Sequence, residues 1–88
     1  MIVRVLHEGQ YELGGEAIAR LRRLDDEWME ALTADDAHRF TELRDELVAL
    51  IRREGRALPQ STLQESDLIV PHADITLGEA RELFTSRG

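Results

Sequence analysis

The sequence contains no cysteine among its 88 residues. Without cysteine the chain has neither a disulfide nor a thiolate metal site to stabilise it. A domain of this length buries only about 60% of the surface of its unfolded chain, so its hydrophobic core is marginal. Self-association is one way for so small a domain to gain stability. We therefore expect a single domain, with a self-assembling homodimer as an alternative to a monomer.

Lysine is also missing, so all 11 basic residues are arginines, against 18 acidic residues and a net charge of −7. An acidic balance argues against nucleic-acid binding, which draws most of its energy from cations placed on phosphates. It also argues against direct docking on anionic lipids, which requires basic clusters. Arginine is a planar donor that suits carboxylate partners, so the composition favours protein–protein contacts.

Long apolar runs are absent as well, and no stretch approaches the roughly 20 residues needed to cross a bilayer. The chain opens with the β-branched run Ile2-Val3-Arg4-Val5, which is typical of a strand and not of a signal peptide. We therefore expect a cytoplasmic protein that reaches a membrane only through a partner.

The N-terminal pattern predicts a β-hairpin over residues 2–13. Its apolar run breaks at Glu8-Gly9 and then resumes, and Gly9 is free to adopt the positive φ that such turns require. Alternation with period two places Val3 and Val5 on the same face.

Two helical patterns follow, at residues 15–33 and 36–54. Thr33 or Asp35 can cap the second helix, and Asp36 favours its positive end. Helices of nearly equal length joined by so short a link form an antiparallel αα-hairpin. Because two helices cannot close a core alone, we expect the sheet or a second subunit to cover them.

The last third of the chain predicts three further elements: an ordered loop at residues 56–66, a strand at 68–70 and a helix at 77–85. The loop is anchored by Leu58 and Leu63, and the strand joins the N-terminal hairpin. Thr76, three residues before Glu79, forms a capping box at the start of the helix.

These patterns predict one α+β domain over residues 1–88: a small N-terminal β-hairpin and a third short strand, packed on an antiparallel αα-hairpin with a short C-terminal helix. The predicted core consists of Val3, Val5, Leu13, Ile18, Leu21, Trp28, Phe40, Leu43, Leu47, Leu50, Ile69 and Leu83.

Several segments carry a family resemblance. They are Met1-Ile2-Val3-Arg4, Glu8-Gly9-Gln10-Tyr11, Leu24-Asp25-Asp26, Ser66-Asp67-Leu68-Ile69-Val70-Pro71, Asp74-Ile75-Thr76-Leu77 and Glu79-Ala80. In this order, and with matching element lengths, the chain resembles the PspA-associated protein family, PspAA, over nearly its whole length. The second and fourth of these segments are the most specific.

The resemblance implies a small accessory protein of phage-shock-type envelope stress systems in actinobacteria and archaea. There the gene lies beside one for PspA, a long coiled-coil protein that assembles on stressed membranes. The family has no accepted catalytic activity, so the resemblance supplies no catalytic residue and no cofactor. We therefore predict a non-enzymatic adaptor or regulator of a PspA-like coiled-coil protein.

A small-ligand or metal-binding module is the least favoured alternative. Its zinc ligands would be His7, His38 and His72, which lie on three separate elements without a ligand-like spacing. The acid pairs Asp25-Asp26 and Asp35-Asp36 fall near the helix junctions, where capping and solvation explain them better than acid–base catalysis.

Six residues are predicted to contact a partner. Trp28 is interpreted first as core, with a role as an interface anchor as the alternative. Tyr11 lies in the most specific tetrapeptide and either packs over the hairpin or meets a partner. An exposed apolar seam of the αα-hairpin would dock against a partner helix. Arginines would set its register by pairing with carboxylates: Arg22, Arg23, Arg52 and Arg53.

Overall fold

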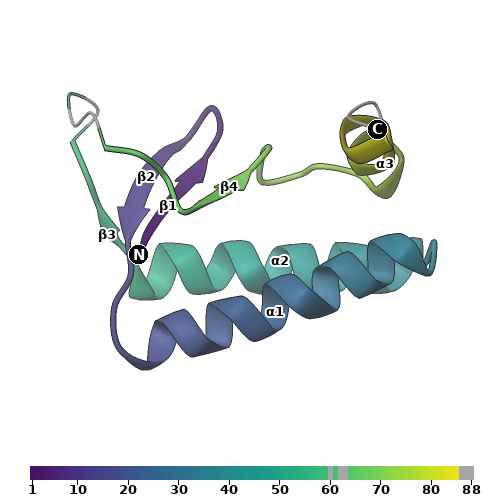
Figure 1. Ribbon diagram of the computed structural model, residues 1–88, viewed down its shortest axis with the longest axis horizontal. Helices are drawn as coiled ribbons and strands as arrows, with labels where there is room; N and C mark the ends of the chain where they lie inside the picture. Colours follow the sequence, from purple (N-terminus) through teal and green to yellow (C-terminus); the bar gives the residue numbers. More distant parts are fainter. Residues whose placement is uncertain (60, 62–63, 86–88) are drawn as a thin grey trace.

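A computed structural model describes residues 1–59, 61 and 64–85 of the chain (Figure 1). A small sheet and a C-terminal helix lie on the same side of a long helical pair. The elements are β1 (Ile2–Val5), β2 (Gly9–Glu12), α1 (Glu16–Thr33), α2 (Ala37–Glu54), β3 (Arg56–Ala57), β4 (Leu68–Val70) and α3 (Leu77–Thr85). The predicted α+β architecture is confirmed.

The sheet has four strands in the order β3-β2-β1-β4. β1 pairs antiparallel with β2 and parallel with β4, with Arg4 opposite both Gln10 and Ile69. The prediction that the strand at 68–70 joins the hairpin is therefore confirmed. β4 lies at one edge of the sheet, where its three residues end at Pro71.

The turn of the β-hairpin requires positive φ at two positions. Gly9 has a φ of 145°, as predicted, and His7 has a φ of 70° although it carries a side chain. A left-handed conformation is uncommon for a residue with a Cβ, and histidine is among the residue types that tolerate it. His7 itself is exposed, so its side chain meets no steric obstacle.

The two helices of the pair begin and end close to the predicted positions. The predicted cap of the second helix at Thr33 or Asp35 is wrong: Asp36 is the N-cap, and its carboxylate accepts a hydrogen bond from the amide of Arg39 at 3.0 Å. The Thr33 hydroxyl instead donates to the carbonyl of Met29, one turn back. At the start of α3 the predicted capping box is present, with Thr76 and Glu79 bonded reciprocally.

The predicted loop over 56–66 is wrong at its start, because Arg56 and Ala57 pair with β2. Two residues are too few to show a period, so no sequence pattern marks this strand. Beyond it, the amide of Leu58 donates to the carbonyl of Gln10 at 2.9 Å, which keeps Leu58 against the hairpin. Leu63 lies outside the described residues.

A close backbone approach joins α2 to β2. Gly55 follows α2 with an ordinary φ of −81°. A Cβ at this position would lie 2.9 Å from the Cβ of Tyr11 and would clash with the carbonyl oxygen of Ile51. Glycine is therefore required here for space and not for backbone conformation.

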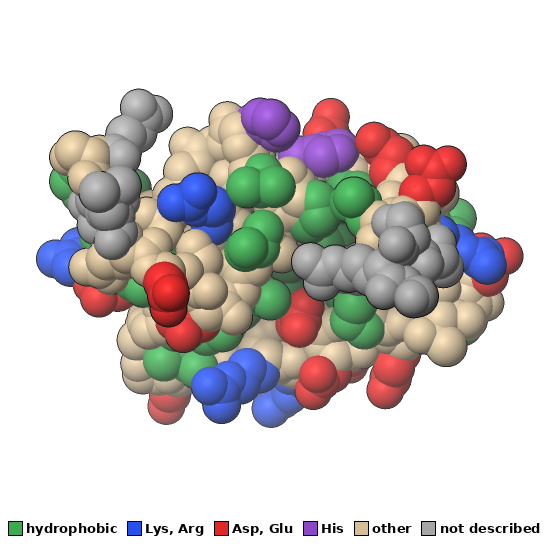
Figure 2. Space-filling model, turned by 45° about the horizontal axis from the view of Figure 1, so that its top comes forward, with side chains coloured by type: hydrophobic (Ala, Val, Ile, Leu, Met, Phe, Trp, Pro, Cys, Tyr) green, Lys and Arg blue, Asp and Glu red, His purple; other side chains and the backbone are tan. Residues whose placement is uncertain are grey.

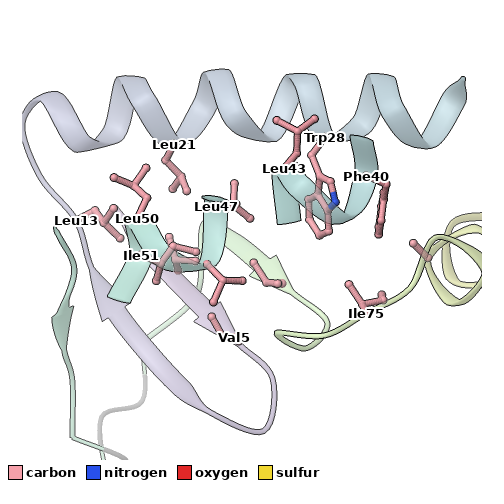
Figure 3. Packing of buried hydrophobic residues seen from close by; sticks show 14 of the residues in the cluster. Val5, Leu13, Leu21, Trp28, Phe40, Leu43, Leu47, Leu50, Ile51 and Ile75 are labelled. Atoms are coloured by element: carbon pink, nitrogen blue, oxygen red, sulfur yellow. The ribbon is translucent and has the colours of Figure 1, made fainter. Parts of the chain in front are cut away.

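The hydrophobic core lies between the helical pair and one face of the sheet, and continues under α3 (Figure 3). Nine of the twelve predicted core residues are buried, and Ile18 is half-buried. Two predictions are wrong: Ile69 is 54% exposed and Leu83 is 47% exposed.

Strand alternation explains the error at Ile69, because its neighbour Val70 takes the inward position and Ile69 therefore points to the opposite face. On α3, Ala80 is the residue that faces the helical pair, and Leu83 falls to one side of it. The buried Ile75, on the segment before α3, completes this end of the core.

Candidate partner-binding surface

The hairpin turn is fastened to α2 by three side chains. The Tyr11 hydroxyl donates to the Glu8 carboxylate at 2.7 Å, and the Arg52 guanidinium donates to both of its oxygens, at 2.5 and 3.0 Å. The hydrogen bond from Arg52, followed by the one from Tyr11, lowers the pKa of Glu8 to about 2. The hydrogen bond to Glu8 raises the pKa of Tyr11. We call this cluster the turn clip.

The turn clip explains two of the predicted contact residues by internal bonds. Tyr11 is half-buried and its hydroxyl is bonded to Glu8, while Arg52 forms an ion pair with the same carboxylate. Arg52 connects elements that are 44 residues apart in sequence. Sequence reasoning missed the role of Glu8, since nothing local indicates that α2 returns to the turn.

A second set of bonds joins residues 64–67 to the N-terminal hairpin, and one of them links the two most specific segments of the chain. The buried Gln10 amide donates to the Gln64 carbonyl at 2.9 Å and to the Ser66 hydroxyl at 3.1 Å. The Asp67 carboxylate accepts from the backbone amide of Ile2 at 2.8 Å, and the Asp67 amide donates to the Ile2 carbonyl at 2.7 Å. These bonds therefore hold residues 64–67 against the N-terminal hairpin.

The remaining arginines lie on the exposed surface of the αα-hairpin. Arg22 and Arg23 are exposed, and within the described residues neither makes a hydrogen bond or an ion pair. Arg53 lines a shallow groove between α1 and α2, together with Arg20 and Glu46. The floor of this groove is small, because the apolar stripes of both helices face the sheet and α3.

Trp28 is only 2% exposed and belongs to the core. Its ring packs on Phe40, with the ring centroids 5.1 Å apart and an interplanar angle of 33° (Figure 3). The Nε1–H group of Trp28 is buried and has no hydrogen-bond partner. In this conformation Trp28 cannot reach a partner directly.

Two large apolar side chains remain exposed together on the outer face of the sheet. Leu6 follows β1 and is 38% exposed, and its amide donates to the carbonyl of Val70. Arg4 lies opposite Ile69, and Leu6 comes two residues after Arg4. Side chains two residues apart in an extended chain point to the same face, so Leu6 and Ile69 lie beside one another on this face. We call Leu6 and Ile69 the apolar face. Figure 2 shows apolar side chains around a hollow on the side of the molecule that carries β4 and α3.

The structure does not bring together the three histidines of the least favoured alternative, zinc binding. His7 lies in the hairpin turn and His38 on α2, where it approaches Glu42 at 3.4 Å. His72 approaches Asp74 at 2.7 Å and Glu79 at 3.5 Å. No group of three or more His, Asp and Glu side chains in the described part of the chain is arranged to hold a metal ion.

The two acid pairs have different surroundings. The expectation that both lie near helix junctions is wrong for Asp25 and Asp26, which are in the middle of α1. Burial, and then the neighbouring charge of Asp26, raises the pKa of the half-buried Asp25. Asp36 caps α2, as described above, and Asp35 forms an ion pair with Arg81 at 2.6 Å.

None of the helices in the described part of the chain combines the length and the apolar composition that a membrane span requires.

Comparison with protein families identifies the family of the chain. The family model PspAA, PspA-Associated protein, matches residues 1–88. The chain belongs to the PspAA family. The resemblance seen in the sequence is thereby confirmed over the whole chain. No curated protein and no solved structure matches the chain. The name of the family indicates association with PspA, which is consistent with an accessory role.

Proposed function

We propose that the chain is a non-enzymatic adaptor that binds a PspA-type coiled-coil protein in the cytoplasm by protein–protein contact. Membership of the PspAA family is the observation that carries this proposal. It is supported by the turn clip and the Gln10 and Asp67 bonds, which use the most specific residues to build a scaffold. A scaffold of this kind presents a surface and has no need of reactive groups.

The apolar face is the surface that fits a helix of the coiled coil. Ile69 and Leu6 are exposed beside one another, and large exposed apolar residues that adjoin each other are typical of protein contacts. Addition of a partner strand to β4 is less favourable, because three residues closed by Pro71 offer too short an edge. A helix instead uses side-chain packing along its apolar stripe.

Arg22, Arg23 and Arg53 orient the partner in this proposal. Exposed arginines with no internal partner are free to pair with carboxylates of an approaching helix. Such pairs on the rim of an interface speed association and fix register more than they add affinity. Charge reversal of Arg22 and Arg23 should therefore slow association and reduce its dependence on ionic strength.

The proposal is tested by calorimetric titration of the PspA-type protein from the same organism into purified chain. The variant Ile69→Glu places a charge in the apolar face, and Ala37→Glu places the same charge at an exposed position in the first turn of α2. We expect Ile69→Glu to weaken binding by about tenfold or more, since a buried unpaired charge is costly. Ala37→Glu should bind as the unmodified chain does. Equal binding by both variants would exclude the apolar face as the contact.

A further inference from the structure

α3 packs against one end of the helical pair, next to the loop that joins α1 to α2 (Figure 1). We call the surface of α1 and α2 that α3 covers its seat. Ala80 of α3 and Ile75, which lies two residues before α3, are completely buried. Figure 3 shows Ile75 beside Phe40, at the end of the core next to α3. Because Ala80 is small, the axis of α3 can approach the helical pair closely. The seat therefore accepts an amphipathic helix with a small residue at the centre of its contact.

Among the described residues, one buried side-chain donor has no hydrogen-bond partner. The Nε1–H of Trp28 is buried beside Phe40 and has no acceptor. Burying a donor without an acceptor costs about 1–3 kcal/mol. A state in which this group met an acceptor would regain that energy. Phe40 in turn lies next to Ile75, so the unsatisfied group belongs to the end of the core that α3 covers (Figure 3).

Two ion pairs of α3 in the described part of the chain lie at the surface. Arg81 pairs with Asp35 at 2.6 Å, but both side chains are more than half exposed. His72 approaches Glu79 at 3.5 Å on the surface. Exposed ion pairs contribute little, typically about 0–1 kcal/mol each. The Arg44 guanidinium, which is mostly buried, adds one bond to the Ile75 carbonyl at 3.2 Å.

We propose that α3 is a displaceable cover, and that an amphipathic helix of the coiled-coil partner takes its seat on α1 and α2. This inference rests on the proposed function and names the part of the molecule that opens. The partner helix would present a small residue over the seat and an acceptor side chain to the Trp28 Nε1–H.

Hydrogen exchange of the unmodified chain provides the first test. If α3 leaves its seat without global unfolding, amides of residues 80–83 exchange at least about tenfold faster than those at the centres of α1 and α2. Exchange of α3 at the same rate as these centres would overturn the inference, because α3 would then open only when the whole domain unfolds. This result does not depend on any partner.

A reversible lock provides the second test. Because the chain has no cysteine, the variant Asp35→Cys/Arg81→Cys can be joined by a short reducible bis-thiosulfonate crosslinker, which holds α3 in its seat. The control Arg20→Cys/Glu54→Cys joins α1 to α2, whose side chains approach at 2.8 Å far from α3. Both crosslinks are then opened with dithiothreitol.

We expect the α3 lock to weaken binding of the PspA-type protein by at least about tenfold, with recovery after reduction. The control crosslink should leave binding unchanged. Equal binding by the locked and reduced proteins would overturn the inference while leaving the proposed function intact. If the unmodified chain binds no PspA-type protein, the proposed function fails, and the exchange measurement alone decides whether α3 is displaceable.

Discussion

The two ends of the helical pair are held in different ways. At the sheet end, Asp67, Gln10 and Glu8 each bond to residues far away in sequence, and the donors and acceptors involved are satisfied. At the α3 end, the core contains the Nε1–H of Trp28, which has no acceptor among the described residues, and the ion pairs of α3 with Asp35 and His72 lie at the surface. One small core can therefore carry both a fixed scaffold, at the sheet end, and an element that is easier to release, α3.

The largest expected effect comes from disturbing the sheet end at Gly55. Replacing Gly55 by alanine drives a Cβ against the Ile51 carbonyl oxygen and the Tyr11 Cβ. Neither atom can move aside without a shift of the backbone, because the first belongs to the backbone and the second is bonded to it. We expect Gly55→Ala to lower the free energy of unfolding by about 1–3 kcal/mol, as overpacked cores do. Urea denaturation followed by circular dichroism measures this change.

The matched control for Gly55→Ala is Gly14→Ala. A Cβ at Gly14 would have no atom within 4 Å, so the same chemical change should be nearly neutral. If the two variants lose equal stability, the close approach at Gly55 is not what holds α2 against β2.

The turn clip predicts a smaller effect that depends on pH. The pKa of Glu8 is lowered from 4.5 to about 2, so its carboxylate stabilises the fold above pH 4.5 and this contribution is lost as the pH falls toward 2. Because Arg52 is half exposed, solvent screening limits the contribution to about 1 kcal/mol. Denaturation of the unmodified chain and of Glu8→Gln at several pH values measures it.

In Glu8→Gln the loss between pH 4.5 and 2 should be smaller, because the titrating group is gone. The raised pKa of Tyr11 acts at the other extreme: it favours the fold below pH 10, and that contribution is lost as the pH rises further. Identical acid profiles for the two proteins would show that the clip contributes nothing.

The smallest expected change in global stability comes from the α3 end. Ala80 is completely buried, so Ala80→Glu should expel α3 from its seat. If α3 is a cover, the free energy of unfolding of the remainder falls by no more than about 1 kcal/mol. The emission of Trp28, the single tryptophan, shifts to the red as its ring meets water. A loss of several kcal/mol would show that α3 is integral to the core.

Much of the fold could be predicted from local patterns. The hairpin follows from its period of two and Gly9, the helices from their apolar spacing, and the start of α3 from Thr76 and Glu79. The strand β3 could not be predicted, because its two residues carry no period. The misplacement of Ile69 shows that a run of three apolar residues does not reveal which of them faces the core.

The candidate site was less predictable than the fold, because its decisive contacts join distant residues. Glu8 and Arg52 are 44 residues apart, and Ile2 and Asp67 are 65 apart, so neither pair shows a local signal. The position of Glu8 and Asp67 in the most specific segments of the family resemblance was the one available indication. The unsatisfied Nε1–H of Trp28 depends on how Phe40 packs against the ring, which composition and spacing do not determine.

The most direct test of the central claim is co-purification of the chain with the PspA-type protein of its own organism, followed by measurement of the mass of the complex. The account predicts a stable complex that contains both proteins, and its loss when Ile69 is replaced by glutamate. A chain that purifies alone at every concentration tested, whether as a monomer or as a homodimer, would contradict the account.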